Sequence, residues 1–148
     1  MVIGFTGTRG GMTGPQKEVV KQLLVQIIEK HGSGVVVVLH GDCIGVDAEF
    51  DTIATELGLE RTCRPCTFDH MRANTTATEV SEPDRPMARN RAIVAEADII
   101  IGCPQNDKPI KTGSGTWATI RFTKKADKPL HIVYPDGRAV SSSFPVED

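Results

Sequence analysis

The sequence lacks the features that mark membrane proteins, secreted proteins and most nucleic-acid-binding proteins. No apolar stretch approaches the roughly 18 residues that a membrane-spanning helix requires. No charged segment followed by an apolar core marks a secretory signal. Lys and Arg total 17 against 19 Asp and Glu, so the chain has no basic excess for binding nucleic acid. We therefore expect a cytoplasmic protein without a membrane partner and without a nucleic-acid partner.

The cysteines give little reason to expect a disulfide or a metal site. A chain of this length buries about 68–70% of its unfolded surface, so it can fold without crosslinks. Cys63 and Cys66 form one C-x-x-C pair, with His70 four residues further on, whereas a tetrahedral zinc site needs four ligands. Cys43 and Cys103 follow strands that we expect the first strand to separate, which places them roughly 9–10 Å apart. We expect reduced thiols, no metal and no cofactor.

Two common nucleotide-binding motifs are also missing. The first glycine-rich segment, residues 7–14, has the spacing G-x-x-G-G-x-x-G, which does not match the G-x-G-x-x-G of dinucleotide-binding domains. The sequence contains no G-x-x-x-x-G-K-[ST], so a P-loop ATPase is disfavoured as well.

Strand-like and helix-like segments alternate along the chain. Apolar or extended segments predict strands at residues 1–6, 35–40, 59–63, 98–102 and 130–133. Helical spacing of apolar residues predicts helices over residues 14–31, 46–57 and 87–97, and a fourth helix that ends at residue 125. This alternation predicts an α/β fold with a mainly parallel sheet of about five strands and helices on both faces. We expect one domain over residues 1–135 and a tail at residues 136–148.

The first helix has clear signals at both ends. Thr13 and Gln16 have the spacing of a capping box, and Pro15 suits the first helical turn. His31 and Gly32 predict the end of the helix, because a histidine suits the negative end of the dipole and glycine suits the position after it.

Residues 64–86 show no periodicity and contain three prolines. A stretch of this length in a small domain is typical of a functional loop, and we interpret this one as a candidate lid over the ligand. Arg61, Arg64 and Arg72 lie in or beside it, and we expect them to be solvated. Arg89 is the better candidate for binding phosphate, because its helix begins near the predicted ligand edge.

Glycine-rich loops follow the predicted strands at the edge where parallel α/β sheets bind ligands. Residues 7–14 and 113–116 each lead into a helix, whose free N–H groups and positive dipole end suit a phosphate. Thr8, Ser114 and Thr116 add hydroxyl groups. The alternative is that both loops are tight turns and bind nothing.

Several motifs, taken in order, resemble the SLOG superfamily, which includes the DNA-processing protein DprA and the LOG phosphoribohydrolases. They are residues 4–9 (GFTGTR), 40–47 (HGDCIGVD), 89–94 (RNRAIV), 97–101 (ADIII) and 113–116 (GSGT). The resemblance runs from about Met1 to Val133, and is greatest to small single-domain bacterial and phage members. It implies a Rossmann-like three-layer αβα fold, a nucleotide-type ligand at the sheet edge, and a homodimer.

The resemblance is weaker for catalysis. LOG enzymes carry G-G-x-G-T-x-x-E, and the Glu position is occupied here by Thr119, which cannot act as an ionised carboxylate beside a developing cation. Arg89 lies where the LOG arginine would fall. If the protein is an enzyme, the catalytic candidates are Asp42, Asp47 and Arg89. The structural alternatives are a turn-capping Asp42 and an Asp47 that interacts with a helix dipole.

The leading hypothesis is a nucleotide-binding domain with a sensory or regulatory role. One alternative is an N-glycosidase that cleaves a nucleoside 5′-monophosphate, and another is DprA-like binding of single-stranded nucleic acid. The residues expected to bind the ligand are Gly7, Thr8, Arg9, Gly41, Asp42, Gly45, Arg89, Asn90, Gly113, Ser114, Gly115 and Thr116.

Overall fold

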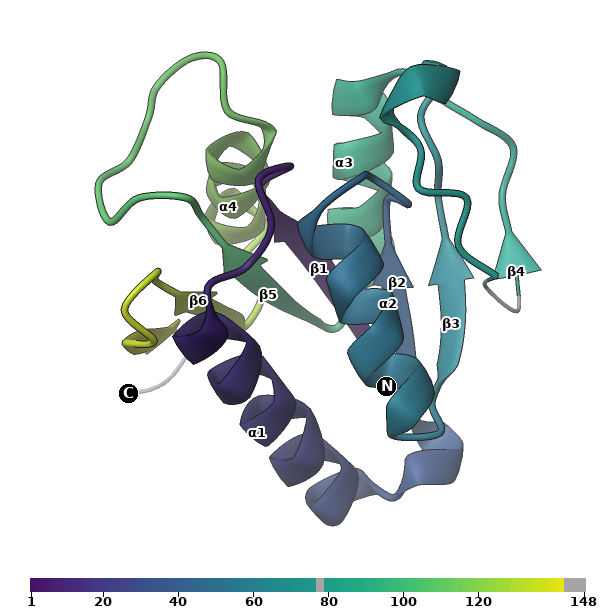
Figure 1. Cartoon of the computed structure of the whole chain (residues 1–148), viewed down its shortest axis with the longest axis vertical. Coiled ribbons are helices and arrows are strands. Elements are labelled where there is room, and N and C mark those ends of the chain that lie inside the picture. The colour runs from purple at the N-terminus through teal and green to yellow at the C-terminus, as the bar shows by residue number, and fades with distance from the viewer. Residues whose placement is uncertain (77–78, 143–148) are drawn as a thin grey trace.

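A mainly parallel sheet forms the middle layer of the computed structural model, which describes residues 1–76 and 79–142 (Figure 1). Within these residues the sheet has seven strands, in the order β4-β3-β2-β1-β5-β6-β7. The strands are β1 (Val2–Gly7), β2 (Val37–His40), β3 (Glu60–Cys63), β4 (Glu79–Val80), β5 (Ile99–Cys103), β6 (Leu130–Val133) and β7 (Ala139–Ser142). All neighbouring strands pair in parallel except β6 and β7.

Helices cover both faces of the sheet (Figure 1). They are α1 (Gly14–His31), α2 (Val46–Glu56), α3 (Pro86–Glu96) and α4 (Gly115–Lys125), with short 3-10 turns at Ser33–Val35 and Asp69–Met71. The apolar cluster under α1 and α2 includes Phe5 of β1, whose ring stacks on Phe50 at 3.8 Å between centroids. A second cluster packs α3 and α4 against the other face, with Ile100 and Trp117 among its members.

The architecture confirms the predicted three-layer fold, but the sheet is larger than the predicted one of about five strands. The two additional strands are β4, which has 2 residues, and β7, which has 4. Neither has the apolar run that marked the other strands, because both lie at the outer edges of the sheet. No helix among the described residues is long and apolar enough to cross a membrane.

The predicted capping box forms, and it ties α1 to the edge of the sheet where the glycine loops lie. Thr13 Oγ1 accepts the Gln16 N–H at 3.1 Å, while Gln16 Oε1 accepts the Thr13 N–H at 2.9 Å. The buried Gln16 amide also donates to the carbonyls of Pro104 and Val133, both at 3.0 Å. Because those carbonyls follow or end β5 and β6, the start of α1 is fixed beside the carboxyl ends of the strands.

Candidate ligand-binding site

A cavity of about 860 Å³ lies at the carboxyl ends of β1, β2 and β5. Small-molecule sites in proteins measure about 300–1,000 Å³, so its volume suits a small organic ligand. Most of the predicted ligand-binding residues line it, namely Gly7, Thr8, Arg9, Gly41, Arg89, Asn90, Gly113, Ser114, Gly115 and Thr116. Asp42 and Gly45 do not line it.

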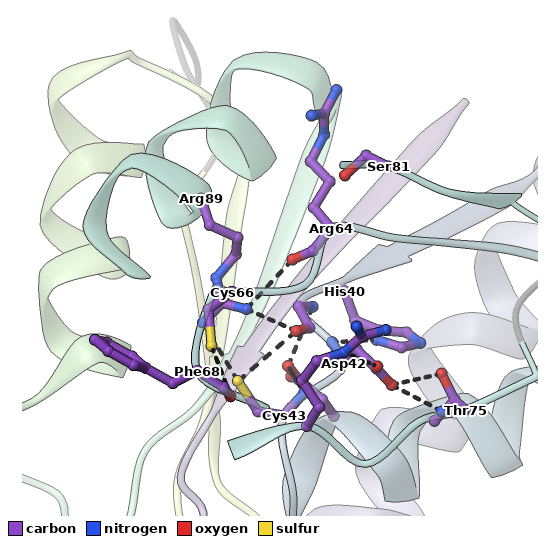
Figure 2. A network of polar contacts seen from close by, with 12 residues as sticks. His40, Asp42, Cys43, Arg64, Cys66, Phe68, Thr75, Ser81 and Arg89 are labelled. Carbon is purple, nitrogen blue, oxygen red and sulfur yellow. Dashed lines mark hydrogen bonds and ion pairs between the residues drawn. The ribbon is translucent and has the colours of Figure 1, made fainter. Parts of the chain in front are cut away.

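Arg89 of α3 is a buried guanidinium group in the wall of this cavity, with only 6% of the residue exposed. Its Nη1 donates to the carbonyl oxygens of Gly41 at 2.6 Å and Arg64 at 3.3 Å, and Nη2 contacts Cys43 Sγ at 3.3 Å (Figure 2). Among the described residues, no carboxylate lies within 4.0 Å of its nitrogens, although five other ion pairs form. Carbonyl oxygens accept its N–H groups, and among the described residues no carboxylate forms a direct ion pair with its positive charge.

Gly41 makes room for this guanidinium. A Cβ atom at Gly41 would lie 2.3 Å from Arg89 Nη1 and 2.7 Å from Arg89 Cζ. A side chain at position 41 would therefore push Arg89 away from the end of β2. Because residue 41 is glycine, the end of β2 can contact the Arg89 guanidinium directly.

The start of α4 supplies backbone N–H groups to the same cavity. Ser114 caps the helix, because its Oγ accepts the Trp117 N–H at 3.2 Å. Within the described residues, the N–H groups of Gly115 and Thr116 have no hydrogen-bond partner. They lie at the positive end of the helix dipole and line the cavity, as a phosphate site requires.

Asn90 connects these two groups of donors. Its Oδ1 accepts the Arg89 Nε hydrogen at 2.7 Å, and its Nδ2 would lie 3.5 Å from a Cβ at Gly115. The guanidinium and the first turn of α4 are therefore close enough to act on the same ligand.

The loop after β1 forms the third wall. The Thr8 carbonyl accepts the Val46 N–H at 3.2 Å, so the first N–H of α2 is not free for a ligand. A Cβ at Gly7 would lie 2.4 Å from Val46 Cγ1, and one at Gly45 would lie 2.3 Å from the Arg9 carbonyl oxygen. Gly45 has φ +96°, so it shapes the backbone under the exposed Arg9 and is not itself in the cavity.

The charge of the cavity differs from that of the chain. Its lining contains the cations Arg9, Arg89, Lys111 and Arg121, and among the described residues that line it Asp47 is the sole acid. The formal net charge of the whole chain is -2. This excess of positive charge favours an anionic ligand.

Asp42 has a structural role in place of the predicted contact with the ligand. The residue is fully buried, and its carboxylate accepts hydrogen bonds from Arg72 Nε at 3.2 Å, the Thr75 N–H at 2.9 Å and Thr75 Oγ1 at 2.8 Å (Figure 2). These hydrogen bonds connect Arg72 and Thr75, which follow β3 in the chain, to the residue that follows the end of β2. Asp42 therefore holds the part of the loop at Arg72 and Thr75 in place, and the role of the loop as a lid stays a prediction.

Asp47 lies in the first turn of α2 and in the cavity lining, and only 5% of the residue is exposed. Its Oδ2 accepts the N–H groups of Gly41 and Cys43, both at 3.1 Å. It therefore fixes the turn between β2 and α2 on which Arg89 rests.

The expectation that Arg61, Arg64 and Arg72 are solvated is wrong for Arg61 and Arg72, whose side chains are 12% and 22% exposed, whereas that of Arg64 is 33% exposed. Arg61 Nη1 pairs with Asp51 at 2.7 Å, and Asp51 also contacts the buried His40 Nε2 at 2.8 Å. Arg72 pairs with Asp42, and Arg64 pairs with Glu96 of α3. The acidic partners lie 10–32 residues away in the sequence, so spacing could not reveal them.

The cysteines are free thiols. Cys43 lines the cavity, and burial together with nearby Asp47 raises its pKa to about 12 despite the opposing effect of Arg89. Burial also raises the pKa of Cys63 to about 11. The described part of the chain contains no group of three or more His, Cys, Asp or Glu side chains placed to hold a metal ion.

Thr119, at the position of the LOG glutamate, lies outside the cavity lining. It is 1% exposed, and its Oγ1 donates to the Gly115 carbonyl at 2.8 Å. The acid in the cavity wall is thus Asp47, on a different helix.

Solved structures with the same fold were found, although no protein-family model and no curated protein sequence matches the chain. The molybdenum cofactor binding protein of Rippkaea orientalis aligns with a TM-score of 0.66 at 22% identity, over 90% of this chain and 76% of that one. The molybdenum cofactor carrier protein of Chlamydomonas reinhardtii gives a TM-score of 0.60 at 22% identity, over 88% and 74%. DNA processing protein A of Helicobacter pylori gives 0.57 at 19%, over 89% and 64%. These likenesses confirm the Rossmann-like three-layer fold that the resemblance implied.

Proposed function

We propose that this cavity binds a small molecule that carries a phosphate group, with nucleotides as the leading class, and that the protein senses or carries this ligand. The observation that supports the proposal best is Arg89, a buried guanidinium in the cavity wall without a carboxylate partner among the described residues. Burying an uncompensated charge is costly, and an anionic ligand would offset that cost. A phosphate would also accept the free N–H groups of Gly115 and Thr116.

Binding is favoured over cleavage of the ligand. N-glycosidic cleavage needs a carboxylate beside the developing cation, and the position of the LOG glutamate holds Thr119, which lies outside the cavity lining. An N-glycosidase that acts through Asp47 is therefore the less favoured alternative, and release of free base from a nucleoside monophosphate would reveal it.

The molybdenum cofactor is a second ligand class, because two of the similar structures are of molybdenum cofactor binding or carrier proteins. It too combines a phosphate with a fused heterocycle, so the same donors would hold its phosphate. A third class is single-stranded DNA, which DNA processing protein A from Helicobacter pylori binds.

A thermal-shift screen followed by calorimetry tests the proposal. The probes are AMP, ADP, cyclic AMP, ADP-ribose, the molybdenum cofactor kept under anaerobic conditions, and a short single-stranded oligonucleotide. A ligand at 100 times its Kd stabilises the folded protein by about 2.7 kcal/mol. We expect at least one of the phosphate-bearing small molecules to produce such a shift.

Two arginine variants then identify the site. Arg89→Lys keeps a positive charge but loses the planar fork, so it should weaken binding of the phosphate-bearing probe by about tenfold or more. Arg91→Lys is the matched control, because Arg91 is exposed on the same helix, lies over the Phe122 ring and does not line the cavity. No shift with any small-molecule probe, or equal binding by both variants, contradicts the proposal.

A further inference from the structure

Asp47 is an exception in a cavity that is otherwise cationic. Only 5% of the residue is exposed, yet it contributes to the lining beside Gly41 and Cys43. The contacts that fix the turn all use one of its oxygens, since both backbone N–H groups donate to Oδ2. Among the described residues, no donor contacts Oδ1.

Asp47 Oδ1 is not fully buried. The described residues contain no fully buried side-chain oxygen or nitrogen without a hydrogen-bond partner. Oδ1 therefore has access to the space that Asp47 lines, which is the cavity. Its position is rigid, because the two bonds to Oδ2 hold the carboxylate in place.

We infer that Asp47 Oδ1 accepts a hydrogen bond from an O–H or N–H group of the ligand, and so selects phosphate-bearing ligands that carry such a donor. This inference rests on the proposed function and goes beyond it, because it assigns the part of the ligand that is not phosphate. A carboxylate oxygen accepts hydrogen bonds and repels a second anion. The phosphate is thereby directed toward the first turn of α4, and a neutral donor-bearing group lies against Asp47.

Two chemical sources can supply the donor. One is a sugar hydroxyl, and the other is the N–H edge of a heterocycle such as guanine. A ligand without the donor would leave Oδ1 buried and unsatisfied, which sites of this kind reject strongly. Loss of a hydrogen bond to a charged group weakens binding by about 10- to 150-fold.

The substitution Asp47→Asn tests this role with little change to the turn. The asparagine oxygen can still accept the N–H groups of Gly41 and Cys43, and its NH₂ group then replaces Oδ1 as a donor. Glu49→Gln is the matched control, because it removes one negative charge from the same helix, and Glu49 does not line the cavity.

The probes are AMP, 2′,3′-dideoxyadenosine monophosphate and purine riboside 5′-monophosphate, whose base has no N–H group, each titrated by calorimetry into the whole chain. For a hydroxyl donor, the wild type should bind AMP at least about tenfold more tightly than the dideoxy form; for an N–H donor on the heterocycle, it should bind AMP more tightly than the purine riboside form by a similar factor. In Asp47→Asn the ratio of the two affinities should fall toward one, whereas in Glu49→Gln it should stay at the wild-type value.

Ratios near one in the wild type, or a ratio that Asp47→Asn leaves unchanged, overturn the inference and leave the proposed phosphate site standing. If the wild type binds none of the three nucleotides, the inference fails together with the nucleotide class of the proposed function.

Discussion

The substitution Gly115→Ala tests whether a phosphate lies against the first turn of α4. Gly115 is the first residue of that helix and lines the cavity. A Cβ there would meet Asn90 Nδ2 at 3.5 Å, which is ordinary van der Waals contact. Gly14 is a matched control, since it is the first residue of α1, also follows a hydroxyl cap, lies outside the cavity and has no atom within 4 Å of such a Cβ.

The two substitutions should affect stability alike. Neither glycine has a positive φ, so alanine fits the backbone at both positions. Alanine restricts the unfolded chain, and each variant should gain about 0.4–1 kcal/mol in free energy of unfolding. Binding should differ, because the methyl group of Gly115→Ala occupies the space of a phosphate oxygen bonded to the helix N–H groups. Losing one such charge-assisted bond corresponds to about 1.5–3 kcal/mol, or a 10- to 150-fold increase in Kd.

Urea unfolding followed by calorimetry with the best-bound phosphate probe measures both quantities. The expected pattern is equal or greater stability in both variants and weakened binding in Gly115→Ala alone. If Gly115→Ala binds the probe as tightly as Gly14→Ala does, the phosphate does not lie at α4 and the role assigned to its free N–H groups is wrong.

Three further predictions concern stability and reactivity. Lys128 Nζ donates to the carbonyls of Val94, Ala95 and Ala97 at 2.7–2.8 Å, so Lys128→Met should cost about 1–3 kcal/mol in urea unfolding; an effect no larger than that of the exposed Lys21→Met contradicts this. Burial lowers the pKa of His131 below 6.5, so the unfolded chain takes up more protons and stability should fall as pH drops below 6.5. His131→Gln should make the free energy of unfolding depend less on pH below 6.5. An unchanged pH dependence in this variant contradicts the role assigned to His131. Since the pKa of Cys43 is about 12, iodoacetamide should modify this thiol at pH 8 at least about a hundredfold more slowly in the folded than in the urea-unfolded protein, as followed by mass spectrometry.

Features that depend on neighbouring residues could be predicted from the sequence. The capping box of Thr13 and Gln16 forms, and α1 ends at His31 and Gly32 as expected, because both signals are set within one helical turn. The glycine segments at residues 7–14 and 113–116 lead into helices at one sheet edge, since parallel strands place their carboxyl ends together. The position of Arg89 follows for the same reason, because it lies near the start of a helix that reaches this edge.

Features that depend on distant partners could not be predicted. Asp42 follows β2 at the predicted edge, but its carboxylate turns toward Arg72 and Thr75, which are 30 and 33 residues away. The strand β7 pairs with β6 across a turn, although its residues, Ala139–Ser142, have no apolar run. In both cases the deciding contact joins segments whose separation carries no periodic signal. The predicted homodimer likewise depends on a surface outside the chain, and stays a prediction.

The net charge of the chain has the opposite sign to the charge of the cavity, because Asp47 is the one acid among the described residues that line it, while the chain has 19 acids in all. Two buried acids outside the cavity lining form ion pairs, Asp51 with Arg61 and His40 and Asp42 with Arg72, and the exposed Glu96 pairs with Arg64. These pairs are close to neutral and lie outside the cavity lining. The cations that remain at the carboxyl ends of the strands, led by Arg89, therefore act on the cavity in spite of the net charge of -2. Because electrostatic attraction between buried groups depends on distance within a medium of low dielectric constant, the local set of charges determines the ligand class and the total does not.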